Sequence, residues 1–325
     1  MEMPVEHMQK IFGAGDSYIK KIERDFQVII TDRNGKVNIT GEESQANKAC
    51  RILAGLLNSS IKGNEIEEQR VDYAITLGME EKEELLTEID SDTICHTISG
   101  KPIKPKTLGQ KQYVDAIRDK MIVFGLGPAG TGKTYLAMAM AITAFKNDEV
   151  SRIILTRPAI EAGEKLGFLP GDLQSKVDPY LRPLYDALYQ IMGAESFAKN
   201  MEKGLIEVAP LAYMRGRTLD NAYIILDEAQ NTTPAQMKMF LTRIGFGSKV
   251  VITGDSSQKD LPVGTKSGLD IATKVLSKID DIAFCNLTSK DVVRHPLVQK
   301  IVKAYDDYEA KEKSRTSRDR GPRKA

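Results

Sequence analysis

The chain has 325 residues, of which 41% are hydrophobic and 28% charged, and its formal net charge is +1. This composition is typical of globular proteins, and the length allows a sizeable core and two domains. The three cysteines and three histidines are scattered, which excludes a disulfide framework and a Cys/His metal site and favours a reducing compartment. The N-terminus lacks a signal-peptide pattern and the longest apolar run is too short for a bilayer, so we expect a cytoplasmic protein without a membrane segment.

Residues 11–57 predict a small α/β module. Candidate strands at 26–30 and 37–39 flank an Asn-Gly turn, and helical stretches lie before and after this hairpin. A Gly-containing turn at 13–16, followed by helix, hairpin and helix, resembles a KH domain. In that family a GXXG loop clamps the nucleic-acid backbone.

The turn Gly13-Ala14-Gly15-Asp16 departs from the KH pattern in two ways. Its second glycine comes one place early, and Asp16 would repel a phosphate. Lys20 and Lys21 follow on the helix and are the candidate nucleic-acid contacts of this module. Two interpretations stay open: the module binds nucleic acid, or it serves packing or subunit contacts.

Residues 61–105 form a connection. Ten acidic residues between Ile66 and Asp92 face only Arg70 and Lys82 in the same stretch, and apolar residues are interspersed among them. We therefore expect helices with a solvated acidic face. The sequence 101–106 follows, and its two prolines fix an extended path that marks a domain boundary.

From Thr107 onward candidate strands alternate with helices, which predicts an α/β fold: a parallel sheet with helices on both faces. After Glu309 the composition turns basic and lacks bulky apolar residues, so we expect a disordered tail that contacts RNA or nothing. The candidate strands are 121–126, 152–157, 205–209, 222–227, 249–253 and 282–287, and the helices lie near 109–120, 134–146, 178–192, 234–244, 265–279 and 296–310.

The first chemical motif fits the phosphate-binding pattern G-x-x-x-x-G-K-[ST], between an apolar strand and an Ala/Met/Leu-rich helix. Its glycines let several backbone N–H groups point at one anion, and the helix N-terminus adds partial positive charge. Lys133 is predicted to reach the β- and γ-phosphates, and the Thr134 hydroxyl to bind Mg²⁺. The motif is Gly127, Pro128, Ala129, Gly130, Thr131, Gly132, Lys133 and Thr134.

Two further apolar strands end in polar residues. After the first, Asp227 is predicted to hold the Mg²⁺ water shell and Glu228 to polarise the attacking water. After the second, Gln258 is predicted to contact the γ-phosphate, with a locally bonded turn amide as the alternative. Because ligands bind at the carboxyl ends of parallel strands, we expect all three motifs to meet in one crevice.

The order G-x-x-x-x-G-K-T, I-I-L-D-E-A-Q and I-T-G-D-x-x-Q resembles the ATPase core of superfamily 1 helicases. More closely, the chain resembles the PhoH-like family over about residues 105–308, with the KH-like module in front. The resemblance implies a P-loop NTPase (RecA-like) fold, ATP and Mg²⁺ as cofactors, a cytoplasmic location, and a link to RNA metabolism and phosphate stress. Further stretches that carry it are 105–112 (PKTLGQKQ), 156–159 (TRPA), 166–172 (LGFLPGD), 214–218 (MRGRT) and 291–296 (DVVRHP).

The resemblance also implies roles for single residues. Gln110 or Gln112 would read the adenine edge, with an exposed helix-cap amide as the alternative. Arg157 would contact the nucleic-acid backbone. Arg294 looks like an arginine finger, and Arg215 and Arg217 would share that role or bind RNA. Each arginine could instead be an ordinary surface or salt-bridge residue.

These observations lead to competing functional hypotheses. The leading one is an ATP hydrolase coupled to RNA binding or remodelling; the alternative is a nucleotide-gated adaptor that recruits a ribonuclease or ribosome-associated factor with little turnover. A small-molecule kinase is a third, disfavoured because Glu228 beside Asp227 suits water activation. Since helicases of this type use two cores and the chain has room for one, we expect a homo-oligomeric ring, such as a hexamer.

The sequence divides into four predicted segments. They are a KH-like domain at 1–60, an acidic helical connection with a Pro/Lys linker at 61–105, a P-loop ATPase domain at 106–309, and a basic disordered tail at 310–325.

Overall fold

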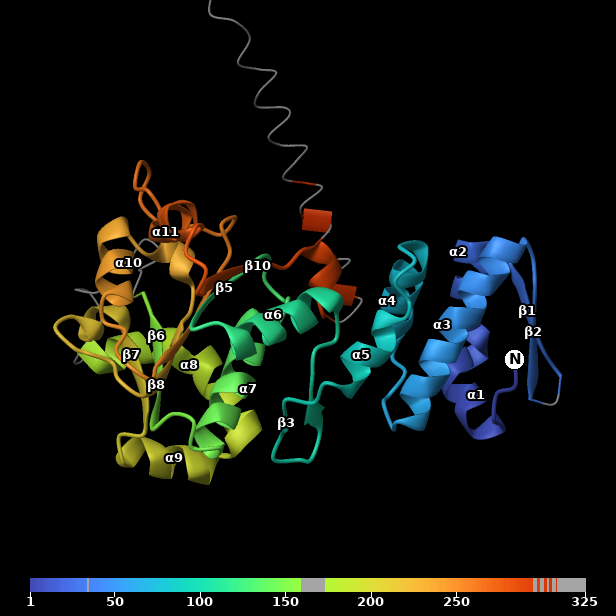
Figure 1. The fold of residues 1–325 in the computed structure, drawn as a ribbon, viewed down its shortest axis with the longest axis horizontal. Helices are drawn as coiled ribbons and strands as arrows, with labels where there is room; N and C mark the ends of the chain where they lie inside the picture. Colours follow the sequence, from blue (N-terminus) through green and yellow to red (C-terminus); the bar gives the residue numbers. More distant parts are fainter. Residues whose placement is uncertain are drawn as a thin grey trace, which may run out of the picture. The chain divides into compact units, whose positions relative to one another are not determined.

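The structure is a computed structural model (Figure 1). It describes residues 1–33, 35–158 and 173–294, together with 297, 298, 301, 302, 304, 305 and 308, and over 173–180 it describes the backbone alone. The chain divides into two compact units, Met1–Val292 and Val293–Ala325. The 166–172 stretch, much of the helix expected at 296–310 and the expected tail at 310–325 lie outside the described residues.

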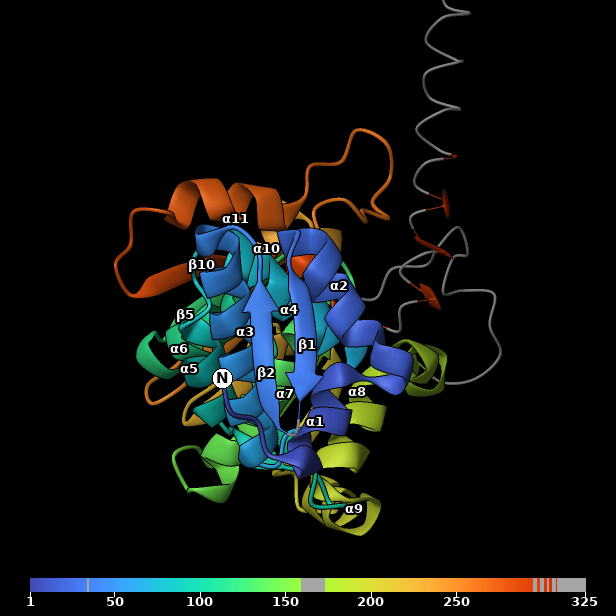
Figure 2. The same cartoon turned by 90° about the vertical axis from the view of Figure 1, so that its right-hand side faces the viewer.

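The N-terminal module contains the expected turn, helix, hairpin and helix, preceded by one helix that was not predicted. Its first strand begins at Ile29 and not at the predicted residue 26, because the preceding helix continues to Phe26. Its two strands pair antiparallel, with Ile30 opposite Ile39, and Figure 2 shows them side by side in front of the helices. The elements are α1 (Val5–Phe12), α2 (Ser17–Phe26), β1 (Ile29–Arg33), β2 (Lys36–Thr40) and α3 (Glu43–Ile61).

The acidic stretch after α3 folds into two helices, α4 (Glu68–Met79) and α5 (Leu85–Ser91). Helices were expected here because apolar residues recur between the acids. The apolar face of α4 and Leu86 of α5 are buried in the same hydrophobic core as Phe26 and Leu53 of the N-terminal module. The core that begins at Met3 therefore extends to residue 86.

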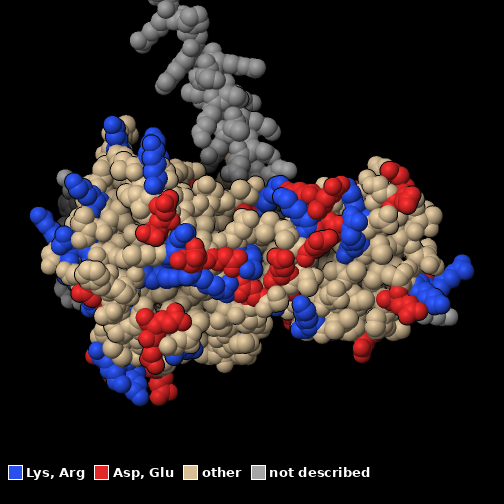
Figure 3. Space-filling model, in the orientation of Figure 1, with Lys and Arg blue, Asp and Glu red and all other residues tan. Residues whose placement is uncertain are grey.

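The acidic side chains of this stretch have basic partners from other elements. Lys21 of α2 contacts Glu68 and Asp72 at 2.8 and 2.6 Å, and these carboxylates outweigh burial and raise the pKa of Lys21. The Arg118 guanidinium binds Asp92 at 2.5 Å and is the main cause that lowers the pKa of that carboxyl. In Figure 3, acidic side chains around α4 to α6 lie among basic ones. The local charge balance therefore overstates how acidic this surface is.

A short antiparallel pair, β3 (Cys95–His96) and β4 (Pro102–Ile103), leads into the second half of the chain. The main sheet has six strands in the order β10-β5-β9-β8-β6-β7, and every pair in it is parallel. Each observed strand starts and ends within one residue of its predicted range. They are β5 (Ile122–Leu126), β6 (Arg152–Arg157), β7 (Ile206–Pro210), β8 (Ala222–Leu226), β9 (Lys249–Gly254) and β10 (Ile282–Asn286).

Helices cover both faces of this sheet because alternate residues of each strand point to opposite sides. Val123, Tyr223 and Val251 pack into one core with α6 to α9, whereas Phe124 and Ile252 pack into the other with α10 and α11. The predicted α/β fold, a parallel sheet with helices on both faces preceded by a small α/β module, is thus confirmed. The helices are α6 (Leu108–Asp119), α7 (Lys133–Lys146), α8 (Leu173–Met192), α9 (Ala194–Glu202), α10 (Pro234–Leu241) and α11 (Gly268–Leu276).

Helix α9 was missed, and α10 and α11 are shorter than predicted. Pro234 begins α10 under a capping box from Thr233 and Gln236, a start that the sequence analysis did identify. Among the described residues, no helix combines the length and apolar character that a membrane crossing requires.

Candidate nucleotide-binding site

The phosphate-binding loop connects β5 to the start of α7. Gly127 has φ 144°, and a Cβ on it would lie 2.3 Å from the Leu287 carbonyl oxygen, so only glycine fits. Thr131 Oγ1 donates to the Pro128 carbonyl at 2.9 Å and tightens the turn. The Lys133 ammonium folds back over the loop and donates to the carbonyl oxygens of Gly127 and Pro128 at 2.6 and 2.8 Å.

Gln110 is the glutamine that the structure places against this loop. It lies in the first turn of α6, is 3% exposed, and its Nε2 donates to the Thr131 carbonyl at 3.0 Å. Its Oε1 accepts from the Lys106 backbone N–H at 2.7 Å, so the amide connects the chain before α6 to the loop. Gln112 lies on the exposed face of the same helix. Of the two candidates, only Gln110 is in contact with the phosphate-binding loop.

Asp227 follows β8 and holds two threonine hydroxyls. Its Oδ1 accepts from Thr134 Oγ1 and from Thr253 Oγ1, both at 2.7 Å. Thr253 is the penultimate residue of the neighbouring strand β9. The sequence pattern predicted no role for it, although its place before Gly254 in a buried strand was visible. Among the described residues no cluster of three His, Cys, Asp or Glu side chains could hold a metal.

These oxygen atoms nevertheless suit Mg²⁺. The ion takes hard oxygen ligands, keeps several waters, and needs only one or two protein groups when phosphates supply the rest. Thr134 and Asp227 line one cavity of about 270 Å³ together with Lys133 and Gly130. Asp255 lines it too, and its Oδ2 is buried without a hydrogen-bond partner in the described structure. The donor set therefore fits the ion that the sequence suggests.

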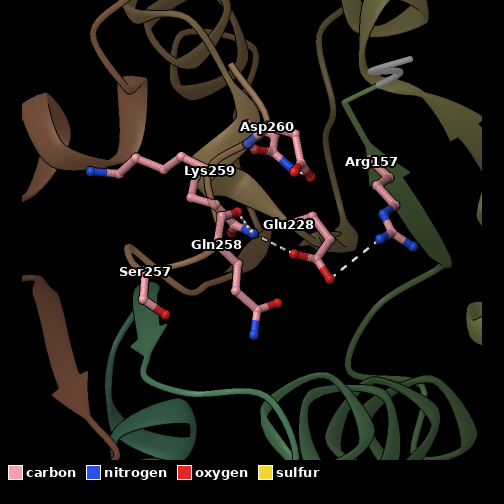
Figure 4. A pocket seen from close by; sticks show the side chains of 8 residues that line it. Arg157, Glu228, Ser257, Gln258, Lys259 and Asp260 are labelled. Carbon is pink, nitrogen blue, oxygen red and sulfur yellow. Dashed lines mark hydrogen bonds and ion pairs between the residues drawn. The ribbon is translucent and has the colours of Figure 1, made fainter. Parts of the chain in front are cut away.

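Glu228 is held in a defined position beside Asp227. Its backbone is left-handed, with φ 53° and ψ 40°, which turns its side chain away from the strand direction. Oε1 lies 3.3 Å from the Arg157 guanidinium, and Oε2 accepts from Gln230 Nε2 at 2.5 Å. Figure 4 shows the carboxylate facing the Arg157 guanidinium.

Gln230 belongs to the motif I-I-L-D-E-A-Q, whose pattern predicts no role for it. It is fully buried, and its Nε2 also donates to the Gln258 carbonyl at 3.1 Å while its Oε1 accepts from the Asp255 N–H at 3.0 Å. One amide thus ties Glu228 to the loop after β9. Only the three-dimensional arrangement reveals this, because the pattern D-E-A-Q does not show where the amide points.

Gln258 lies between two cavities. It lines the 270 Å³ cavity of the phosphate-binding loop and a second one of about 450 Å³. In Figure 4 its side chain points away from Asp260, on the same side as Glu228. The second cavity is lined by Arg157, Glu228, Gln230, Asn231, Ser257, Gln258, Lys259 and Asp260.

The remaining candidate cations have varied surroundings. Arg217 binds Glu207 through both guanidinium nitrogens at 2.5 and 2.7 Å, which raises the pKa of Arg217. Arg215 is exposed. Lys20 donates to the Gly15 carbonyl at 2.9 Å, next to the turn of the KH-like module. Arg294 belongs to the second unit, which starts at Val293, so its position relative to the phosphate-binding loop is not described.

The parallel sheet, the glycine loop at the end of β5 and the paired acids at the end of β8 define a P-loop NTPase fold. Comparison with family models matches residues 102–306 to the PhoH-like protein family and residues 1–55 to the KH domain. The chain therefore belongs to the PhoH-like family, as the motifs suggested.

Named relatives agree with this assignment. The chain is 55% identical to a PhoH-like protein of Bacillus subtilis over 296 residues, which is 91% of this chain and 93% of the relative. It is 56% identical to a PhoH-like protein of Synechocystis over 90% of both chains. It is 46% identical to Protein PhoH of Escherichia coli over 63% of this chain and 58% of that one.

Among solved structures, the Sulfolobus solfataricus SWI2/SNF2 ATPase core in complex with dsDNA matches 45% of this chain and 31% of its own, at 17% identity and a TM-score of 0.31.

Proposed function

We propose that this protein binds ATP with Mg²⁺ and hydrolyses it, and that hydrolysis is coupled to RNA binding or remodelling. The single observation behind the proposal is that Lys133, Thr134, Asp227, Glu228 and Gln258 line one cavity at the carboxyl edge of the sheet. Phosphate cradle, metal-binding oxygens and a water-orienting carboxylate are the parts that phosphoryl transfer to water requires.

Each side chain then has a role that its contacts support. The Lys133 ammonium, now on two loop carbonyls, exchanges them for phosphate oxygens. Gln110 supports the loop through the Thr131 carbonyl, and in this proposal the adenine lies beside it. Glu228 orients and polarises water, and Gln258 contacts the γ-phosphate. Mg²⁺ held at Thr134 and Asp227 would neutralise charge on the phosphates.

RNA enters the proposal through the KH domain match at 1–55 and through Arg157 at the sheet edge. We further propose that the protein works in the cytoplasm as a homo-oligomeric ring. A single core offers one wall of a nucleotide cleft, so the opposite wall, including an Arg294 finger, would come from a neighbouring copy. A monomer with undiminished ATPase at working concentration would contradict the ring.

The test is phosphate release from ATP by the purified chain, with and without single-stranded RNA, beside Lys133→Ala and Glu228→Gln. We expect turnover that RNA accelerates and that both variants abolish. Equilibrium binding of a fluorescent ATP analogue is measured in parallel, because Glu228→Gln should bind the analogue normally and Lys133→Ala should not.

The adaptor hypothesis is favoured by one observation: Glu228 is engaged by Arg157 and Gln230 rather than left to water. A protein of that kind would bind ATP, turn it over negligibly with every nucleic acid tried, and capture a ribonuclease or ribosome-associated factor only when loaded. ATP-dependent capture without RNA stimulation would favour it over the motor.

A further inference from the structure

The Arg157–Glu228 ion pair joins the two cavities described above. Arg157 ends β6 and Glu228 follows β8, and these strands are hydrogen-bonded neighbours in the sheet. The guanidinium lies 3.3 Å from Oε1, with about a quarter of its side chain and a third of that of Glu228 exposed. The carboxylate that would activate water is therefore engaged by a cation that also lines an open cavity.

The second cavity has the features of an anion-binding site in which the Glu228 carboxylate competes for the cation, Arg157. Arginine keeps its charge at any physiological pH and presents a planar fork that suits phosphate oxygens as well as carboxylates. In Figure 4 the Lys259 side chain points away from Arg157, and its ammonium binds Asp270 at 2.5 Å. Arg157 is thus the cation of this cavity that faces Glu228.

We propose that the cavity around Arg157 takes a backbone phosphate of single-stranded RNA, and that this phosphate draws Arg157 away from Glu228. This deepens the proposed function and rests on it: the exchange is the route by which RNA accelerates hydrolysis. With Arg157 on a phosphate, Glu228 keeps only its bond to Gln230 and turns toward water at the γ-phosphate. Arg157 is a positioning residue here, since it acts on the reaction through Glu228.

Asp260 works against the bound phosphate. Its carboxylate lines the cavity, and the Asn231 amide holds it at 3.2 Å. The negative charges of Asp260 and Glu228 weaken the site in the resting protein. Asp260→Asn should therefore tighten RNA binding without altering the Arg157–Glu228 pair.

Two measurements test the exchange. The first is the rate of phosphate release for Arg157→Ala. We expect the rate without RNA to rise about two- to fivefold, the factor that corresponds to a partly exposed ion pair, and the acceleration by RNA to disappear. Arg118→Ala is the matched control, because it removes an arginine from the Asp92 ion pair outside both cavities.

The second measurement does not depend on turnover. Linkage is reciprocal, so removing the carboxylate that competes for Arg157 must favour RNA. We expect Glu228→Gln to bind a fluorescent single-stranded RNA about two- to fivefold more tightly than the wild type without nucleotide. Combining it with Arg157→Ala should cancel the gain.

The outcomes separate the exchange from the proposed function. If the wild type never hydrolyses ATP, the proposed function is contradicted. The RNA affinities of Glu228→Gln and Arg157→Ala still decide whether Arg157 exchanges Glu228 for a phosphate. Arg157→Ala that lowers the rate without RNA, or Glu228→Gln that leaves RNA affinity unchanged, overturns the exchange. If Arg157→Ala leaves RNA affinity unchanged, RNA does not bind in this cavity, and the exchange is overturned. The occupant of the cavity would then be a protein segment.

Discussion

Two buried threonines near the ends of β9 and β6, the strands on either side of β8, make a matched pair. Thr253, in β9, is 1% exposed, and its Oγ1 donates to Asp227 Oδ1 at 2.7 Å. Thr156 lies near the end of β6 and is fully buried, but its Oγ1 has no hydrogen-bond partner in the described structure. The same substitution, threonine to valine, should therefore destabilise the protein at Thr253 but not at Thr156.

The magnitudes follow from what each hydroxyl does. Thr253→Val removes a hydrogen bond to a buried carboxylate, and hydrogen bonds to charged groups contribute about 1.5–3 kcal/mol. Thr134 still donates to Asp227, which places the expected loss near the lower end, about 1.5–2 kcal/mol. Thr156→Val removes a hydroxyl that is buried unpaired, so stability should stay unchanged or rise by about 1 kcal/mol.

Hydrogen exchange of the β8 and β9 amides is the suitable assay, because the N-terminal core and the sheet cores are separate and the chain has no tryptophan to report unfolding. In protein without nucleotide, Thr253→Val should lower the free energy of opening that hydrogen exchange reports for these amides. Thr156→Val should not lower it. Equal losses in both variants would refute the claim that the bond to Asp227, rather than the shape of the side chain, carries the effect.

Four further outcomes are expected. Gly127→Ala should abolish nucleotide binding and destabilise the chain, because its Cβ would lie 2.3 Å from a backbone oxygen, whereas Gly264→Ala, with φ +88° and nothing within 4 Å, should show only the backbone strain in thermal unfolding. Burial raises the pKa of Cys285 to about 11, so its alkylation in the native protein should rise about tenfold per pH unit from pH 8 to 10, followed by mass spectrometry against denatured protein. Arg118→Gln should cost about 1 kcal/mol at neutral pH, the upper end for a partly exposed ion pair. Because Arg118 lowers the pKa of Asp92, this cost is full above the ordinary Asp pKa and vanishes in urea titrations as pH falls through the lowered folded value. Asp92→Asn should abolish that pH dependence. Tyr73→Phe removes the acceptor that binds the Leu108 N–H at 2.5 Å, so the start of α6 should lose about 1 kcal/mol of protection from hydrogen exchange while the start of α7 stays unchanged.

Much of the fold was predictable because it depends on local patterns. Apolar runs bounded by glycine and polar residues placed all six strands of the main sheet, since parallel strands buried on both faces appear as continuous apolar segments. The family was predictable for the same reason: its motifs sit in loops directly after these strands. Helix α9, by contrast, follows a single glycine after α8, and its short apolar pattern, with Phe197 buried, resembles the end of a longer helix.

Long-range contacts could not be predicted in this way. The acidic run at 67–92 suggested a solvated negative face, yet Lys21, Arg118 and Lys290 reach it from elements distant in sequence. A count of charges along the chain cannot include partners that only folding supplies. The same limit applies to Arg217, whose pairing with Glu207 depends on β7 lying beside it.

The position of Glu228 depends on three strands that are neighbours in the sheet and not in the sequence. β8 delivers the carboxylate, β6 delivers Arg157, and the loop after β9 delivers the carbonyl and N–H groups that fix Gln230. A ligand that moves either partner must alter the carboxylate, because both of its oxygens are engaged. An RNA phosphate that binds Arg157 at the end of β6 should therefore also change the contacts of the Glu228 carboxylate in the proposed nucleotide site. This is why RNA affinity and the contacts of Glu228 should vary together.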